Sequence, residues 1–153
     1  WLDRGVLDYP LAAGGDHYLY NHELGLDDGS TAPATAISPY IESSQVDLGD
    51  GHNFAFITRL LPDITFDGSS STAPAALFTL KTRNFSGGNY LQTDSNTVTQ
   101  TASATSTVVE QFTEQAYVRL RGRSFALKIE SSGADTQWRL GSPRLDVRQD
   151  GRR

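Results

Sequence analysis

The sequence predicts an all-β fold, an antiparallel β-sandwich built from hairpins. Three observations predict it. No window shows apolar residues sustained at helical spacing, and short alternating polar and apolar runs recur along the chain. Clusters of Gly, Pro, Asp and Asn separate these runs, which is typical of strands joined by turns. With 153 residues, of which 37% are apolar, the chain is long enough for one domain with a real core.

Composition removes several classes of protein. The chain has no cysteine, which excludes disulfides and thiolate metal sites. No apolar run approaches the roughly 18 residues that a membrane helix needs, so no membrane contact is expected. The chain contains no methionine and begins with Trp1, which is expected of a processed chain or of a piece of a longer protein.

The chain is predicted to divide unevenly. Residues 1–36 read as an irregular segment with one short strand at 17–22, and residues 37–153 read as the sandwich domain. A strand is predicted over 41–48, followed by a turn at the sequence GDG, where glycine supplies positive φ angles. The next strand is predicted to place four alternate residues on one face: Phe54, Phe56, Thr58 and Leu60.

A further strand is predicted over residues 75–83, whose sequence is AALFTLKTR. Its side chains alternate, and the apolar pair Phe78 and Leu80 is expected to face the core.

The stretch YVRLRGRSFALKIE, residues 117–130, contains a shift in apolar phase. Even positions are apolar before Gly122 and odd positions after it. A strand changes faces only at a turn or a bulge. A two-residue hairpin loop at Gly122-Arg123 would oppose Leu120 to Phe125 and Val118 to Leu127. A bulge at Gly122 within one long strand is the alternative. The predicted core residues of this stretch are Val118, Leu120, Phe125, Leu127 and Ile129.

The same pattern recurs around the sequence GSPR. A turn there would oppose Leu140 to Leu145 and Trp138 to Val147. These four residues complete the predicted core of the C-terminal hairpins.

Charge is distributed unevenly around the net value of -5. Residues 1–116 carry four basic and fourteen acidic side chains, a net of -10, whereas residues 117–153 carry nine and four, a net of +5. Arg119, Arg121 and Arg123 stand at alternate positions and are predicted to form an outward basic face or subunit interface. The hairpin would place Arg123 in its turn, so that only Arg119 and Arg121 would remain on the outward face of the strand.

Two partners are conceivable for these arginines. Nucleic acid is one, with Arg139, Arg144, Arg148, Arg152 and Arg153 as neighbours in the sequence. The chain is net acidic, however, and little aromatic interleaving is expected on that polar face. Pairing with acidic neighbours, either Glu110 and Glu114 or another subunit, is therefore the favoured interpretation.

No catalytic or metal-binding constellation stands out. There is no Gly-x-Ser-x-Gly elbow, and His17 and His22 are five positions apart, so they would point to opposite faces of a strand. The aspartates near glycines do not match a calcium loop: Asp27, Asp28, Asp47 and Asp50. The carboxylates Glu23, Glu42 and Asp63 offer glycosidase-like pairs only in the sense that any acidic chain does. The prediction is a non-enzyme with no metal and no cofactor.

Several stretches of the sequence carry a signal that is more specific than amino-acid composition. They are NHELG, then SPYIESSQVDLGDGHNFAFITRLLPDITFDGS, then FTLKTRNFSGG, and finally YVRLRGRSFALKIESSGADTQWRLGSPRLDVRQDGRR. Together, over residues 18–153, they resemble the C-terminal part of the nozzle or DNA-stabilising tail proteins of short-tailed bacteriophages. The final stretch, with its RGR strand, WRLG, LDVR and closing DGRR, is the most specific.

The resemblance implies a structural component of the virion tail without a catalytic role. Proteins of that family assemble into a ring, usually a hexamer, below the portal and adaptor proteins, and contact packaged DNA only transiently. A larger propeller-like region precedes the corresponding part in that family. The rival hypothesis is a carbohydrate-binding sandwich module, with Trp1, Trp138 and six tyrosines available for sugar stacking.

Overall fold

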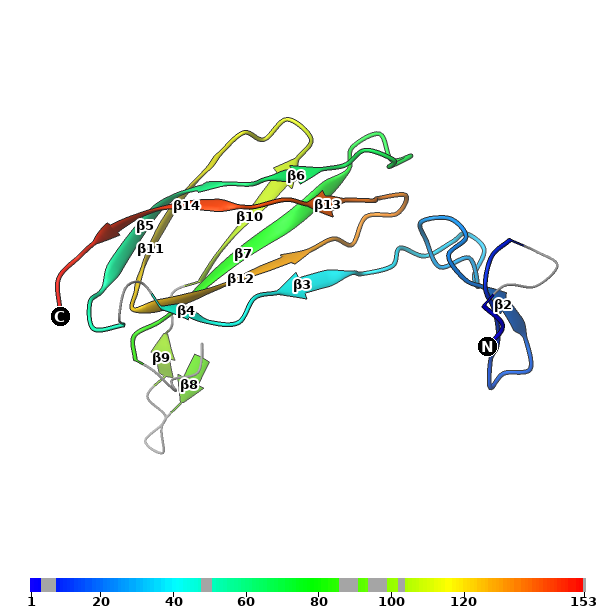
Figure 1. Cartoon of the computed structure of the whole chain (residues 1–153), viewed down its shortest axis with the longest axis horizontal. Helices are drawn as coiled ribbons and strands as arrows, with labels where there is room; N and C mark the ends of the chain where they lie inside the picture. Colours follow the sequence, from blue (N-terminus) through cyan, green and yellow to red (C-terminus); the bar gives the residue numbers. More distant parts are fainter. Residues whose placement is uncertain (4–7, 48–50, 86–90, 94–98, 102–103, 153) are drawn as a thin grey trace.

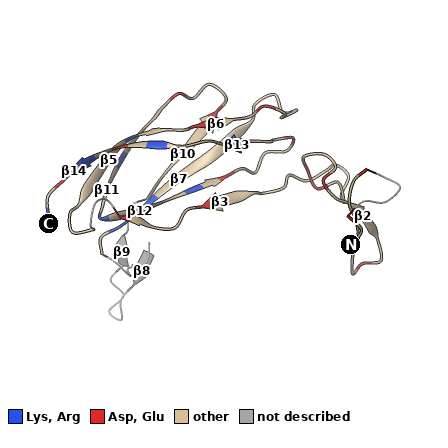
Figure 2. Cartoon of the chain, in the orientation of Figure 1, with Lys and Arg blue, Asp and Glu red and all other residues tan. Residues whose placement is uncertain are grey.

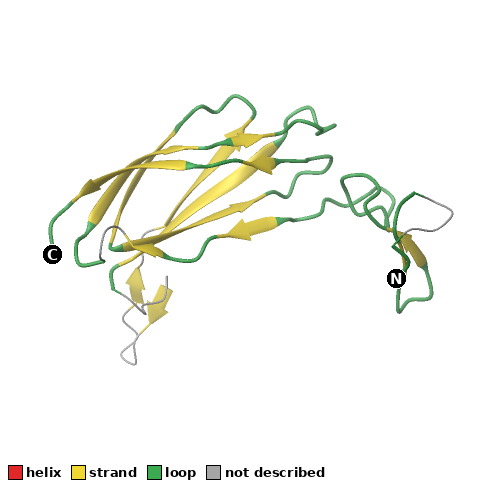
Figure 3. Cartoon of the chain, in the orientation of Figure 1, coloured by secondary structure: helices red, strands yellow, loops and turns green. Residues whose placement is uncertain are grey.

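The computed structural model confirms the all-β fold (Figure 3). It describes residues 1–3, 8–47, 51–85, 91–93, 99–101 and 104–152. Within these ranges there is no helix, and hence none that could cross a membrane. The strands form two antiparallel sheets that face each other across a common core (Figure 1).

The large sheet has the strand order β10-β7-β12-β3, with β4 also paired to β12. Its strands are β3 (Tyr40–Glu42), β4 (Val46–Asp47), β7 (Ala75–Arg83), β10 (Ala104–Glu110) and β12 (Ser124–Glu130). The small sheet has the order β11-β5-β14. Its strands are β5 (Ala55–Leu61), β11 (Ala116–Gly122) and β14 (Arg144–Gln149).

Three short pairs complete the fold. The pair β6 (Ile64–Thr65) and β13 (Arg139–Leu140) prolongs β5 and β14. The strands β8 (Leu91–Thr93) and β9 (Thr99–Thr101) pair with each other, as do β1 (Leu11–Ala13) and β2 (Leu19–Asn21).

The core lies between the two sheets and takes residues from both. One cluster contains Leu60 of β5 with Phe78 of β7 and Ile129 of β12, and the other joins Leu80 to Leu120. Val118 is buried in the second cluster, while Phe125, Leu127, Trp138, Leu140 and Leu145 are partly buried against one or both. The inward direction predicted for Phe78 and Leu80 is confirmed, since both are 1% exposed.

The predicted hairpin at Gly122-Arg123 is wrong. β11 belongs to the small sheet and β12 to the large sheet, so Leu120 pairs with Ile57 and Leu127 with Leu80. At this point the chain crosses from one layer to the other beside the end of β7. The N–H of Arg123 donates to the carbonyl oxygen of Arg83 at 2.7 Å.

The second predicted hairpin is also wrong. The sequence GSPR interrupts one long strand, because β13 pairs with β6 and β14 with β5. The N–H of Gly141 donates to the carbonyl oxygen of Asp63 at 2.7 Å, which bridges the interruption. Val147 pairs with Ile57 at the edge of the small sheet and is 37% exposed, so its assignment to the core is wrong. The predicted pairing of Trp138 with Val147 is therefore also wrong.

The prediction for β5 missed an irregularity. Ile57 and Leu60 are both buried although they differ in parity, because the register with β11 and with β14 shifts around Thr58. The side chain of Phe56 therefore lies on the outer face of the small sheet, whereas that of Leu60 lies on the inner face. The strand predicted over 41–48 is divided into β3 and β4, and the predicted GDG turn lies partly outside the described residues.

Residues 1–37 form what we call the N-terminal arm. It stands at one end of the molecule, while the C terminus lies at the other (Figure 1). It holds two short strands, β1 and β2, where one was predicted. Among its described residues only Pro10 is buried. Its described hydrogen bonds to the sandwich include those from the N–H of Asp135 to both carboxylate oxygens of Asp27, at 2.8 and 3.0 Å.

Candidate interaction surfaces

The outer side of the small sheet gathers arginines from three strands that are distant in sequence. We call this surface the basic face and define it by Arg59, Arg119, Arg121, Arg144 and Arg148. The register explains the grouping, because Phe56 of β5 pairs on one side with Arg121 and on the other with Arg148. Blue segments on β14 mark part of this face in Figure 2.

Alternation places Arg119 and Arg121 on this outer side. Their neighbours Val118 and Leu120 are 4% and 2% exposed and point into the core. The bulge between Tyr117 and Leu120 widens the local spacing on β11. Arg119 is exposed and lies at the position of this bulge.

Two arginines of the basic face already have partners in the same chain. Arg59 donates from Nε to the Asp146 carboxylate at 2.7 Å, and Arg121 forms an ion pair with Asp150. Both pairs are substantially exposed, and such pairs contribute less than about 1 kcal/mol each. The predicted partners Glu110 and Glu114 are not involved in these two pairs.

The other three arginines of the basic face remain available. Within the part of the chain that the structure describes, it records no ion pair or hydrogen bond from the side chains of Arg119, Arg144 and Arg148. All three are exposed. The basic face therefore carries three unneutralised positive charges beside two that are paired.

Aromatic side chains lie among these arginines, contrary to the sequence prediction. The guanidinium carbon of Arg121 lies 4.0 Å from the centroid of the Phe54 ring, and that of Arg123 lies 4.8 Å from it. Arg123 is thus beside Arg121 rather than turned away in a hairpin. Tyr117, on β11, is 78% exposed, and its hydroxyl group accepts a hydrogen bond from Gln115.

The N-terminal arm presents a different surface. Six large apolar side chains are at least half exposed on it: Trp1, Leu2, Tyr18, Leu19, Leu24 and Ile37. By sequence it carries six acidic side chains and one arginine, a net of 1 - 6 = -5. In its described residues Figure 2 shows Asp and Glu but no Lys or Arg. The arm is therefore both apolar and acidic.

One local contact shapes the turn between β1 and β2. The Tyr20 hydroxyl donates to the Asp16 carboxylate, and this hydrogen bond lowers the pKa of Asp16 below its ordinary value. A carboxyl group with a lowered pKa stabilises the folded turn at neutral pH, and this contribution is lost as pH falls through the folded pKa.

Tyr20→Phe is therefore expected to raise the pKa of Asp16 toward its ordinary value. An NMR titration of the side-chain carboxyl groups measures it. Asp28 is the internal control, because its lowered pKa depends on Ser30 and should not move. An unchanged midpoint for Asp16 in Tyr20→Phe would show that the hydroxyl group is not the cause.

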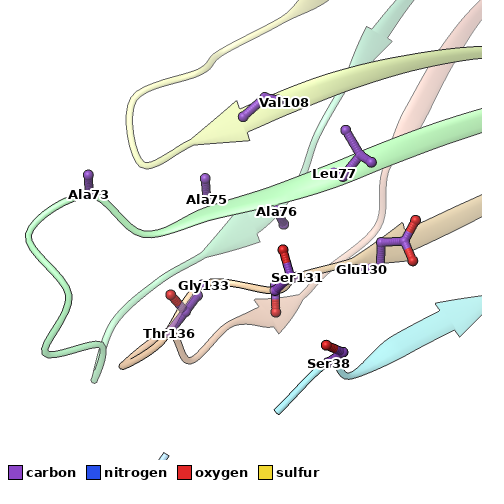
Figure 4. A pocket seen from close by; sticks show the side chains of 11 residues that line it. Ser38, Ala73, Ala75, Ala76, Leu77, Val108, Glu130, Ser131, Gly133 and Thr136 are labelled. Atoms are coloured by element: carbon purple, nitrogen blue, oxygen red, sulfur yellow. The ribbon is translucent and has the colours of Figure 1, made fainter. Parts of the chain in front are cut away.

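A hollow on the large sheet does not resemble an active site. It has a volume of about 530 Å³ and lies between the outer side of β7 and the loop after β12 (Figure 4). Its lining combines apolar groups such as Leu77 and Val108 with serines. Among its described lining residues, Glu130 is the one that is ionisable, and it is already paired with Lys128. A second hollow of about 660 Å³ lies on the arm.

Among the described residues, no three His, Asp or Glu side chains are grouped as metal ligands. The ring of His22 packs instead against Trp1, with their centroids 4.8 Å apart.

Comparison with known proteins adds no relative. No protein-family model matches the chain, and no curated protein matches it. Its function therefore has to be inferred from its surfaces.

Proposed function

We propose that this chain is a structural subunit that works by assembly, as a ring component of a bacteriophage tail would. The ring would include further copies of the chain, with six as the order that the resemblance implies, and would adjoin other tail proteins of the portal-adaptor region. The proposal assigns the chain to the virion, gives it no catalytic role and limits DNA to transient contact.

The observation that carries the proposal is the exposed N-terminal arm. A two-stranded hairpin is at best marginally stable alone in water, and β1 and β2 form only such a pair. Fully burying a side chain the size of leucine contributes about 1.5–3 kcal/mol, so six such exposed side chains represent a large unused stabilisation. A partner that covers the arm would supply it.

The environment of Trp138 favours assembly over the carbohydrate hypothesis. Trp138 is half-buried, packs against the core, and donates from its indole N–H to the buried hydroxyl of Ser131 at 3.0 Å. It therefore does not offer the flat exposed face that sugar stacking requires. Tyr117 and Tyr40 are exposed, but they lie on opposite sheets and form no common platform.

Sedimentation velocity over a range of concentrations tests the proposal. We expect the full chain to populate a defined oligomer whose share grows with concentration. Immunogold labelling of purified phage particles, with antibodies raised against the chain, should mark the tail. A chain that remains monomeric throughout and does not label particles would contradict the proposal, and specific binding on a glycan array would support the rival.

A further inference from the structure

We propose that the N-terminal arm of one copy binds the basic face of a second copy. This inference rests on the proposed function, because it names the surfaces through which assembly would occur. The arm has a net charge of -5, and the basic face holds five arginines, of which three have no ion pair in the described part of the chain. The two surfaces are therefore complementary in charge.

The two surfaces also match in their apolar content. The arm exposes Leu19 to 76% and Trp1 to 73%, and the basic face exposes Tyr117 to 78%. Ion pairs at an exposed rim contribute little affinity but set orientation and exclude wrong partners. The apolar side chains of the arm would supply affinity on covering Tyr117 and its surroundings, and the charges would select the register.

The arm cannot meet the basic face of its own chain in this conformation. Figure 1 places the arm at one end of the molecule, beyond the start of β3, while β11 and the C terminus lie toward the other. The recorded bonds of Asp27 hold the arm to Asp135, in the loop after β12. A contact between arm and basic face therefore requires a second chain.

A second copy explains the surface better than nucleic acid does. The whole chain is net acidic at -5, and the acidic arm would repel a phosphate backbone. Asp146 and Asp150 already occupy part of the basic face, where they would oppose phosphate groups. An acidic and apolar segment fits both the arginines and Tyr117.

The geometry of such a contact has a consequence for the assembly. The arm and the basic face are different surfaces, so the contact is heterologous, with each copy donating an arm and accepting another. Heterologous contacts close into rings when the rotation permits and otherwise continue as filaments. The proposed contact thus generates the kind of assembly that a ring subunit needs.

Charge reversal in the full chain tests the inference. Arg119→Glu with Arg148→Glu lowers the summed charge of the five arginine positions on the basic face from +5 to +1, and Asp3→Lys with Asp8→Lys changes the net charge of the arm from -5 to -1. None of these four side chains has an ion pair or hydrogen bond in the described part of the chain. Each double variant should weaken self-association by about tenfold, since two opposed pairs worth up to about fivefold each give up to about 25-fold.

Complementation decides whether the two surfaces meet. Mixing the two double variants, or combining all four changes in one chain, should restore association. Lys81→Glu with Lys128→Glu is the charge control, because it makes the same charge change on the outer side of the large sheet, where it also breaks the ion pairs of Lys81 with Glu42 and of Lys128 with Glu130. This control should associate like the unmodified chain, and circular dichroism should show that every variant is folded.

Two outcomes would overturn the inference and are distinguishable from failure of the proposed function. If the unmodified chain and the basic-face variant assemble equally well, the arm contact is contradicted, whereas the proposed assembly is not. Salt-dependent binding of duplex DNA that disappears in the basic-face variant while assembly persists would assign the face to nucleic acid. Unmodified chain that never assembles contradicts the proposed function itself.

Discussion

Leu120→Ala is expected to lower the free energy of unfolding by about 2–5 kcal/mol. Leu120 is 2% exposed and lies in the core cluster with Ile57, Leu80 and Val118, drawn from both sheets. Truncation to alanine loses the free energy of transferring the removed methyl groups from water into the core. It also leaves a cavity, because the surrounding strands of the two sheets relax only partially. Urea unfolding followed by tryptophan fluorescence measures the change.

Two controls bound this prediction. Leu127→Ala should cost less than Leu120→Ala, because Leu127 is only partly buried. Val108→Ala should be close to neutral, because Val108 is 57% exposed on the outer side of β10. A cost near zero for Leu120→Ala would refute the inward direction of β11, and with it the outward direction of Arg119 and Arg121.

Gly122→Ala is expected to cost about 1–3 kcal/mol, as overpacking of a tight site does. Gly122 is buried where the chain crosses between the sheets. A Cβ atom there would lie 2.6 Å from the Cβ of Thr82 and 3.0 Å from the carbonyl oxygen of Arg83. Neither atom can yield easily, because Thr82 is buried and its hydroxyl donates to the carbonyl oxygen of Arg121 at 3.1 Å.

Gly29→Ala provides the matched control for this substitution. Nothing lies within 4 Å of a Cβ atom at Gly29, and its φ is not in the left-handed region. The control should change the unfolding free energy by no more than about 0.5 kcal/mol. Equal stabilities for the two variants would contradict the close approach of β11 to β7.

The sequence predicts the class of fold and the direction of β7, but it fails on both C-terminal hairpins. Around GSPR the matched apolar positions belong to one interrupted strand, and around Gly122 they belong to strands of opposite sheets. Matched apolar faces predict that β11 pairs with β12. In a sandwich, strands in opposite sheets also turn their apolar sides toward one shared core, so matched faces do not reveal whether two strands share a sheet. The phase shift at Gly122 was real, and it marked a crossing between layers.

The basic face was only partly predictable. Arg119, Arg121 and Arg123 were recognised from their alternation, but Arg59 and Phe56 were missed because they lie some sixty residues earlier in the chain. They join the arginines because β5 is the middle strand of the small sheet, which no local pattern encodes. The charge contrast between the two parts of the sequence is the available signal, and it predicts pairing with acidic neighbours, either within the subunit or in another subunit.

Energy transfer between labelled copies tests the central claim most directly. The chain has no cysteine, so single cysteines can be introduced cleanly. A donor on Ala13→Cys marks the arm, and acceptors on Gln149→Cys or Ala104→Cys mark the small or the large sheet; all three sites are exposed. After mixing, transfer to Gln149→Cys should clearly exceed transfer to Ala104→Cys. Equal transfer to both, or stronger transfer to Ala104→Cys, would contradict the arm contact.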